Sequence, residues 1–424
     1  MQFGRHRRRM GLGLLVAAVT LLVAATPTVA LASRVASLHS AAKSTINLEQ
    51  INLQSLPGVW DDSGALQAYF SYVNAHGGVD GHKINMTECY AGTLLASSPN
   101  QATTCAQQAV SNHVLALVGD FNDFDSNILP IVAPAHIADF GDFPLSQIDN
   151  TSKDSYPLLT GSALFASGVG TMLVQEGHCK VVGTIVISGT PTETTVVNAV
   201  SSGVKFAGGK VVSPVLVSAT ETDFAPAVAT LESEGATCIA DELGTTGGVA
   251  LATAVSQSGE HVIIGSTGPA YSPAAISALG PLANGILLDQ TAQELAQVTD
   301  AGYHTPGEKL FYQIMQQYDP GNIPLGNSEW PCYESAAASV LVLKYMVSHG
   351  ISLTPANFQK AIPKVNLVTG FFAPVSFASN GPVKSLPRDH AVSVNYLQVE
   401  NDTIVPITHR NYNAALALVK YPNG

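Results

Sequence analysis

Charged side chains are scarce in this sequence, and basic ones are fewer than acidic ones. Asp, Glu, Lys and Arg make up 12% of the residues, whereas 46% are hydrophobic. This balance excludes an intrinsically disordered chain and is typical of a well-buried α/β protein. With 31 acidic against 19 basic residues, the net charge is −12. A chain without a basic face is not suited to phosphate binding, which argues against a nucleic-acid partner.

Signature motifs of catalysis are also missing. No G-x-S-x-G elbow, H-E-x-x-H helix, P-loop or G-x-G-x-x-G fingerprint stands on a strand, turn and helix. The twelve histidines are scattered, and His136 is interpreted as a loop residue rather than a base. A hydrolase needs a nucleophile beside a base, and the sequence shows no clear pair. We therefore expect no enzyme and no cofactor.

Long apolar runs are absent except at the N-terminus. There the basic run Arg5–Arg9 precedes GLGLLVAAVTLLVAA and TVALAS, the three parts of a secretory signal. Residues 1–32 are therefore predicted to be a signal peptide cleaved after Ala32, and the mature protein to be periplasmic, on the cell surface or secreted. An uncleaved membrane anchor remains an alternative, and Arg8 and Arg9 leave a twin-arginine route open. No cysteine follows the run, which argues against a bacterial lipid anchor.

Cysteines are few, as expected for an exported chain with one or two disulfides. Cys89 and Cys105 flank a short segment, and we predict that they pair. Cys179 and Cys238 each open an apolar, strand-like run and would meet if those strands are neighbours. Whether they pair or stay as buried thiols is open. Cys332 has no obvious mate.

Strand-like and helix-like runs alternate along most of the chain, as in βαβ units on a parallel sheet. Strands are predicted at 83–89, 114–119, 180–188, 210–217, 238–243, 261–266, 372–377 and within 391–408. Helices are predicted at 101–112, 126–136, 163–177, 194–209, 224–235, 248–259 and 333–350. The strands of the tail must join one of the sheets.

The length of 424 residues exceeds what one hydrophobic core usually serves, so two lobes are expected. The fold class predicted is α/β, with two doubly wound parallel-sheet lobes joined by a multi-strand hinge. Lobe 1 is assigned to residues 44–157 plus 290–379, and lobe 2 to residues 158–289 plus 380–410. Ligands of such sheets bind beyond the carboxyl ends of the strands.

The stretch YVNAHGGVDGHKI, residues 72–84, resembles the N-A-x-G-G-I-x-G-x-K signature of the branched-chain amino-acid (Leu/Ile/Val)-binding proteins. These are type I periplasmic solute-binding proteins of ABC importers. Weaker matches follow in the family's order: VLALVG, TDFAPAVATLESEGA, GPLANGILL, YESAAASVLVLKYM and FFAPVSFASNGPV. The resemblance implies the periplasmic binding protein type I fold and an extracytoplasmic receptor that closes on a small solute and delivers it to an ABC permease in the membrane. We expect a monomer.

The resemblance is weaker at the positions that hold the ligand. In amino-acid-binding members, hydroxyl groups and backbone amides after the fourth and fifth strands of lobe 1 hold the ligand's carboxylate. Here those loops carry the repeat DFNDF and DFGDF, residues 120–124 and 139–143. Asp123 falls where a serine is expected, and it would repel an anion by about 1 to 4 kcal/mol at 4 Å. The family's acidic anchor for an ammonium group falls on Gly247. The resemblance alone therefore does not assign a simple zwitterionic amino acid as the ligand.

Carboxylates accept hydrogen bonds from hydroxyl or ammonium groups, and aromatic faces stack on sugars or attract cations. The repeat, including Asp120 and Asp139, therefore indicates a small polar solute that is amino-acid-like, a polyol or an organic cation. The candidate ligand-binding residues are Trp60, Asn122, Asp123, Phe124, Phe140, Asp142, Thr190, Thr192, Glu242, Thr245 and Asp289.

Several alternatives remain open. Asp123 or Asp125 would serve equally well as a helix cap, with the phenylalanines packed under the loops, and the threonines as turn residues. A calcium loop is disfavoured because Ile128 and Pro134 occupy the positions that need Gly and Glu, so no metal is expected. A sensory ligand-binding domain of the same fold, or a surface interaction module that has lost ligand binding, are the alternative functions.

Overall fold

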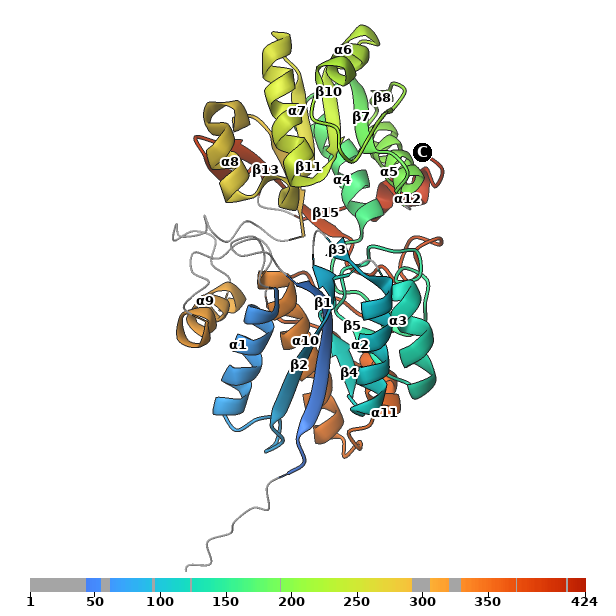
Figure 1. Ribbon diagram of the computed structural model, residues 1–424, viewed down its shortest axis with the longest axis vertical. Coiled ribbons are helices and arrows are strands. Elements are labelled where there is room, and N and C mark those ends of the chain that lie inside the picture. The colour runs from blue at the N-terminus through green and yellow to red at the C-terminus, as the bar shows by residue number, and fades with distance from the viewer. Residues whose placement is uncertain are drawn as a thin grey trace, which may run out of the picture. The chain divides into compact units, whose positions relative to one another are not determined.

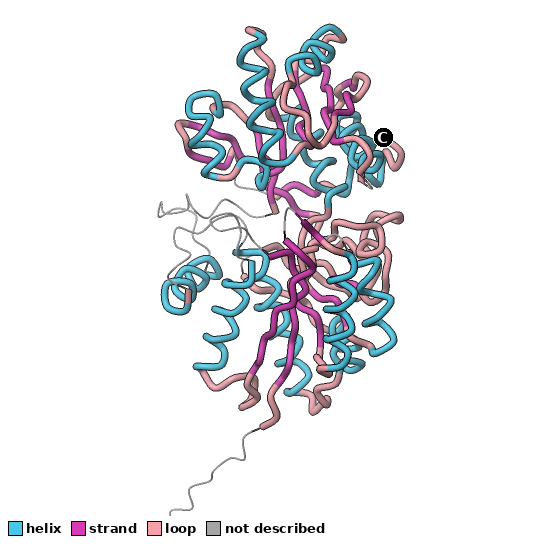
Figure 2. Tube along the Cα trace, in the orientation of Figure 1, coloured by secondary structure: helices cyan, strands magenta, loops and turns pink. Residues whose placement is uncertain are grey.

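A computed structural model describes most of the chain after the leader. The described residues are 43–54, 62–93, 96–122, 124–190, 192–291, 306–319, 329–370, 372–408 and 411–424. The predicted signal peptide and the site candidates Trp60 and Asp123 lie outside them. The described residues form a mixed α/β structure with two sheets, each with helices on both faces (Figure 2).

The first sheet has the strand order β3-β2-β1-β4-β5-β6. Its strands are β1 (Ile46–Gln54), β2 (Ile84–Thr93), β3 (Ala96–Ser97), β4 (Ala116–Val118), β5 (Ala138–Phe140) and β6 (Ser155–Tyr156). All neighbours are parallel except β2 and β3. The side chains of β4 explain why its run is wholly apolar: Ala116 and Val118 enter one core and Leu117 enters the other.

Helices cover both faces of this sheet (Figure 1). One face carries α1 (Asp62–Ala75), α10 (Glu329–Ser348) and α11 (Pro355–Ala361), and α9 (Pro306–Tyr318) packs against α1. The other face carries α2 (Pro99–Ser111) and α3 (Asp125–Val132). The helix α2 begins where the sequence allows it to, because Ser98 accepts a hydrogen bond from the backbone N–H of Gln101 at 3.3 Å.

The second sheet has the order β14-β13-β12-β11-β10-β7-β8, with β9 also paired to β7 and β15 to β13. Its parallel strands are β7 (Val181–Ile187), β8 (Lys210–Val211), β9 (Val215–Val217), β10 (Cys238–Glu242), β11 (Ile263–Thr267) and β12 (Leu287–Gln290). The antiparallel strands are β13 (Ser393–Glu400), β14 (Thr403–Pro406) and β15 (Tyr412–Asn413). The strands of the tail therefore join this second sheet.

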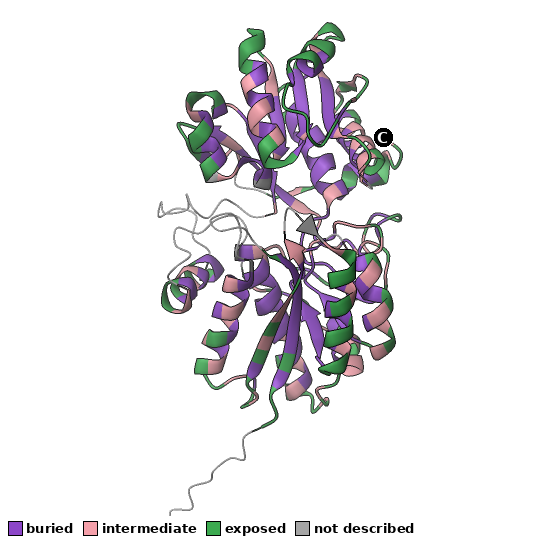
Figure 3. Cartoon of the chain, in the orientation of Figure 1, coloured by how far each residue is buried: buried purple, intermediate pink, exposed green. Residues whose placement is uncertain are grey.

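Two helical layers enclose the second sheet, whose strands are largely buried (Figure 3). One layer holds α4 (Ser162–Gln175), α5 (Glu193–Phe206) and α12 (Ala415–Lys420). The other holds α6 (Ala225–Ser233), α7 (Gly244–Ser258) and α8 (Pro273–Leu279). The short helix α12, which the sequence did not indicate, packs against α4 and α5.

Two predicted strands differ in the structure. The run 210–217 forms the two short strands β8 and β9, because Pro214 lies between them and cannot donate to a ladder. The prediction of a strand at 372–377 is wrong: that segment makes only the single bridge Leu367–Val375. Its alternating apolar residues, among them Phe377, enter the first core from a loop instead.

The predicted disulfide between Cys89 and Cys105 is present, and so is the pair Cys179–Cys238, which the sequence left open. Cys89 and Cys105 join β2 to α2 with their Cα atoms 5.6 Å apart. Cys179 and Cys238 lie 6.0 Å apart and join the segment before β7 to the start of β10. Cys332 is buried on α10, and its Sγ lies 3.8 Å from the carbonyl oxygen of Gly119.

Candidate functional site

The parallel strands of both sheets are arranged in the same way, and this fixes where loops converge. In each sheet the chain moves to one side of its first strand and then returns to the other side, which gives the order 2-1-3-4-5 among parallel strands. The switch point lies between β1 and β4 in the first sheet and between β7 and β10 in the second. Loops beyond the carboxyl ends of such strands diverge and leave room for a ligand. These two edges form the candidate site.

Hydrogen bonds at the first switch point tie the loop after β4 to the end of β1. The backbone N–H of Ile51 donates to Asp120 Oδ1 at 2.9 Å, and Asn122 Nδ2 donates to the Ile51 carbonyl at 3.3 Å. Asn122 Oδ1 accepts from the backbone N–H of Phe124 at 2.7 Å. Both ends of the Asn122 amide are therefore occupied, and in this structure the side chain shapes the loop. Its role in solute binding stays a prediction.

The strand β1 contributes polar residues that the sequence reading did not assign. Gln50 and Asn52 are buried in β1, and Gln50 Nε2 donates to the carbonyl of Gly119 at 2.6 Å. Gly119 adopts a φ of 72°, a conformation that favours glycine, where the chain leaves β4. The signal in the sequence was the run INLEQINLQ, in which strand-like apolar residues alternate with amides.

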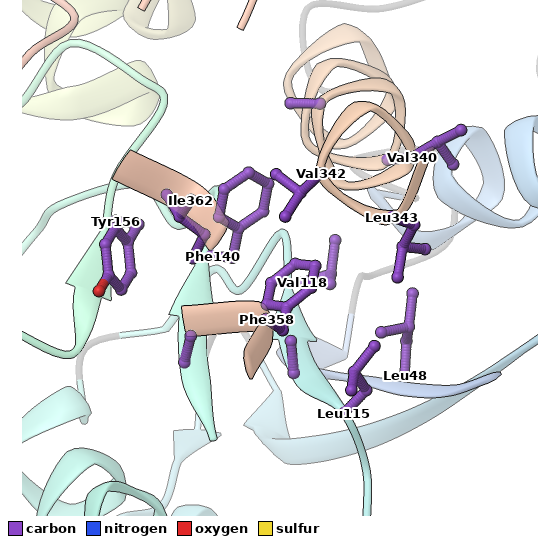
Figure 4. Close-up of a cluster of buried hydrophobic side chains, with 14 of the residues drawn as sticks. Leu48, Leu115, Val118, Phe140, Tyr156, Val340, Val342, Leu343, Phe358 and Ile362 are labelled. Carbon is purple, nitrogen blue, oxygen red and sulfur yellow. The ribbon is translucent and has the colours of Figure 1, made fainter. Parts of the chain in front are cut away.

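The predicted aromatic contacts lie deeper than expected. Phe140 has no exposed surface and meets Phe358 of α11 edge to face, with ring centroids 5.7 Å apart. Figure 4 shows it among apolar side chains of the first core. Phe124 packs against the core beneath α2 and α3. Phe140 presents no surface to a solute here, because β5 directs it into the core.

Strand register explains why the repeat is not a structural repeat. Residues 116, 117 and 118 of β4 pair with 138, 139 and 140 of β5, an offset of 22. The two copies of the sequence pattern are nineteen residues apart, so they lie three positions out of register. Asp120 thus lies level with Asp142 rather than with Asp139. Asp142 is also buried, and its Oδ2 accepts from Ser155 Oγ at 3.4 Å.

In the second lobe, the structure brings together two predicted acids. Glu242 ends β10 and Asp289 lies in β12, and both lie on the face of the sheet covered by α4. Asp289 is fully buried beside Gly168 of α4, where a larger residue would not fit. Glu242 Oε1 and both carboxyl oxygens of Asp289 are buried without a partner among the described residues.

Burial sets the charge of this pair. It raises the pKa of Glu242 to about 8, with a further contribution from the charge of Asp241. It also raises the pKa of Asp289 well above its ordinary value, and the charge of Glu242 adds to that effect. Asp241 points to the opposite face of β10, where Tyr271 donates to its Oδ2 at 2.9 Å. An acid pair of this kind favours a ligand that brings donors or positive charge.

The predicted threonines lie on loops at the second switch point. Thr190 follows β7, and its hydroxyl donates to the Ile187 carbonyl at 3.4 Å, while Thr192 is the residue before α5. Thr245 is exposed in the first turn of α7, directly after β10. These residues are at the predicted edge of the sheet, and their contact with a solute stays a prediction.

Two further properties bear on the site. No group of three His, Cys, Asp or Glu side chains in the described parts of the chain has the geometry to hold a metal ion. None of the described helices combines the length and the apolar character needed to span a bilayer.

The family model of the periplasmic binding proteins matches residues 61–400 of this chain. The chain therefore belongs to that family, and its two lobes have the type I fold. No curated protein matches it in sequence.

Solved structures with similar folds include several solute-binding proteins. A branched-chain amino-acid ABC transporter protein from Thermus thermophilus with bound valine has a TM-score of 0.71 at 14% identity, over 90% of this chain and 99% of that one. A fatty acid ABC transporter substrate-binding protein from Thermomonospora curvata has a TM-score of 0.69 at 18% identity, over 88% and 94% of the two chains. A solute-binding protein from R. palustris in complex with 4-hydroxybenzoate has a TM-score of 0.68 at 18% identity, over 87% and 97%.

Proposed function

We propose that this protein is the extracytoplasmic solute receptor of an ABC importer, and that it binds a small polar solute that donates hydrogen bonds or carries positive charge. Membership of the family and the type I fold support the general function. The N-terminal sequence supports export, and a membrane permease is the expected partner. The solute would be an organic cation, a polyol or an amino-acid-like compound.

The observation that carries the solute class is the pair Glu242 and Asp289. Their buried oxygens have no partner among the described residues, so a solute with hydroxyl or ammonium donors would satisfy groups that are costly to leave unpaired. Glu242 is only partly buried as a residue, which gives the pair a route to the surface. The solutes named for the similar structures, valine and 4-hydroxybenzoate, both carry a carboxylate, which this pair would repel when ionised.

A thermal-shift screen of the purified protein tests the proposal. Organic cations, sugars and polyols should be compared with valine, 4-hydroxybenzoate and fatty acids. A solute at 100 times its dissociation constant stabilises the folded state by about 2.7 kcal/mol, which a melting curve detects. We expect a cation or a polyol to raise the melting temperature. A shift produced only by carboxylates would contradict the solute class while leaving the receptor function intact.

The variant Glu242→Gln tests the acid pair directly. The amide keeps the size of the side chain but removes its charge, so we expect a cationic solute to lose at least about tenfold in affinity, equivalent to 1.4 kcal/mol. Glu260→Gln is the matched control, because Glu260 is exposed. Equal losses in the two variants, or none in either, would show that the pair does not contact the solute.

The release of protons on binding distinguishes a cationic solute from a polyol. Because the pKa of Glu242 is raised to about 8, the carboxyl group is largely neutral at pH 7 before a solute binds. A cation would favour its ionised form, so binding should release protons and strengthen as the pH rises toward 8. A polyol should show neither effect. Calorimetric titrations in buffers of different ionisation enthalpy measure the proton release.

A further inference from the structure

Six aspartates are buried together where the loops after β4 and β5 meet the segment that leads into β13. Each is exposed by 3% or less, and no ion pair joins them to a base of the described chain. They are Asp120, Asp125, Asp139, Asp142, Asp149 and Asp389, referred to below as the aspartate cluster. They interact electrostatically with one another, and Asp149 interacts with the other five. Such a group of like charges would strongly disfavour the folded state.

Few donors reach the cluster. The backbone N–H of Ile51 donates to Asp120, and Ser155 Oγ donates to Asp142, which its own backbone N–H also reaches. Asp149 accepts from the backbone N–H of Ser146 at 2.7 Å and is reached by that of Leu145. Eight buried carboxyl oxygens have no partner among the described residues, including both oxygens of Asp139 and both of Asp389. A buried carboxylate without donors is costly, whereas a protonated carboxyl group is far less so.

One contact inside the cluster depends on a proton. Asp125 and Asp149 lie within hydrogen-bonding reach of each other. Two ionised carboxylates have no donor between them, so this bond exists only when one of the two groups is protonated.

The surrounding elements supply little positive charge. The titratable and charged groups that face the cluster from these elements are Glu49 of β1, Asp154, Tyr156 of β6, and Arg388 and His390 before β13. Arg388 interacts with Asp142, but its Nε donates to the Ser155 carbonyl at 2.7 Å and its guanidinium lies 4.4 Å from the ring centre of Tyr156. One guanidinium does not offset six carboxylates.

We propose that the aspartate cluster is a proton-dependent structural element, which packs in this form only while most of its carboxyl groups are neutral. The protein would then be suited to acidic surroundings. As the pH rises through neutrality, the cluster charges, and the loops that contain it loosen. This proposal is independent of which solute the protein binds.

The direction of the pH dependence follows from proton binding. Burial, and then the charge of Asp149, raise the pKa of Asp139 to about 8 from an ordinary value of 3.8. Burial and Asp149 likewise raise the pKa of Asp389 to about 8, and burial raises that of Asp149 to about 6. Between pH 4 and pH 8 the folded protein therefore holds more protons than the unfolded chain. Stability is highest at the acidic end of this window and falls as the pH rises.

His390 acts in the opposite sense. Burial, and then the charge of Arg388, lower its pKa to about 4, so its effect on stability is complete once the pH exceeds 6.5. Below pH 6.5 the unfolded chain gains at most one proton at this histidine, whereas the folded state holds several more protons at the aspartates. The aspartates therefore outweigh the histidine, and stability still falls as the pH rises from 4.

The cluster lies against the segment that runs from the first lobe into β13, so a change in its charge would also affect that segment. The backbone N–H of Arg388 donates to the carbonyl of Asn150 at 3.1 Å, which attaches this segment to the first lobe. Asp389 Oδ2 lies against Gly161, the residue before α4, where a Cβ atom would come within 2.7 Å of it. The same segment then continues into β13 of the second sheet. Charging would therefore loosen both the loops after β4 and β5 and the connection to the second sheet.

Melting curves of the purified protein from pH 4 to pH 8.5 at constant ionic strength test the proposal. We expect the melting temperature to be highest at the acidic end of this range, and to be lower at pH 8 than at pH 5 by about 10 °C or more. Hydrogen exchange should show faster exchange at pH 8, after correction for the intrinsic rate, in residues 119–156 and 381–391. A melting temperature that is constant or rises between pH 5 and pH 8 would overturn the proposal.

Asparagine variants show whether the pH dependence of stability comes from this cluster or from the other buried acids. Asp139→Asn and Asp389→Asn mimic the neutral form, so each should raise the melting temperature at pH 8 and change it little at pH 5. The exposed control Glu260→Gln should follow the parent at both values. Equal destabilisation of both asparagine variants at both pH values would show that these side chains are structural without being proton-dependent. If one variant fails to fold, the other variant and the hydrogen-exchange pattern of the parent still show whether the cluster is proton-dependent.

Discussion

Single glycines set the distance between α4 and α5. A Cβ atom on Gly203 would collide with the carbonyl of Ser167, and one on Gly170 with the carbonyl of Val200. Both obstacles are backbone atoms, which cannot move aside as a flexible side chain can. The two helices therefore approach this closely only because these positions are glycine.

We predict that Gly203→Ala destabilises the protein. The methyl group would force α4 and α5 apart, and this cost exceeds the gain of about 1 kcal/mol in helix propensity, for a net loss of about 1 to 3 kcal/mol. Thr195→Ala on the exposed side of α5 is the control and should change stability by no more than about 0.5 kcal/mol. Denaturant unfolding measures both. A Gly203→Ala protein as stable as the parent would mean that the helices lie farther apart than described.

Disulfides connect neighbouring elements in each lobe. Cys89–Cys105 closes a segment with a sequence separation of 16, whereas Cys179–Cys238 closes one of 59 and so links β7 to β10 across the second switch point. A longer closed loop removes more freedom from the unfolded chain. The second disulfide should therefore contribute more to stability.

The chain-entropy estimate gives about 3 kcal/mol for the shorter loop and about 4 kcal/mol for the longer. We expect the double variant Cys179→Ala, Cys238→Ala to lose more stability than Cys89→Ala, Cys105→Ala, by about 1 kcal/mol. Denaturant unfolding of the two variants under identical conditions measures the difference. A larger loss from the shorter loop would indicate that packing around the cysteines, rather than loop length, dominates.

Elements with strong periodicity were predictable from the sequence. The runs that became β7, β10 and β11 are apolar on both faces, as parallel strands between two helical layers must be. The strand predicted at 372–377 failed because alternation reports only which residues are buried, and a loop that crosses a core buries alternate residues as a strand does. The short strand β6 has two residues and no periodicity to detect.

The candidate site was predictable only in part, because some of its properties depend on contacts between residues that are distant in the sequence. The sequence indicated which loops follow which strands, and hence Glu242 and Asp289 as candidates. It did not indicate that Asp142 would be buried, because its neighbours in the fold include Ser155 and Arg388, and Arg388 is distant in the sequence. The spacing of the repeat differs from the register of β4 and β5, and register is a property of the folded sheet.

At the scale of the whole molecule, the acidic composition has two consequences. A net charge of −12 with few bases leaves many buried carboxyl groups without an ion-pair partner, as in the aspartate cluster and the pair Glu242 and Asp289. In the first lobe these groups link stability to pH. In the second they leave carboxyl oxygens without a partner among the described residues, near the carboxyl ends of β10 and β12. Buried carboxyl groups without partners cost the folded state free energy. A solute with donors would reduce this cost in the second lobe, and an acidic medium would reduce it in the first.

We propose that the protein is a solute receptor whose binding depends on the second-lobe acid pair. Isothermal titration of the solute found in the screen, into the parent and into Glu242→Gln, measures this dependence. We expect one solute bound per chain in the parent and, where the solute is a cation, binding at least about tenfold weaker in the variant at pH 7. Failure of every cation, polyol and amino-acid-like compound to bind the parent would contradict it, as would unchanged affinity in the variant.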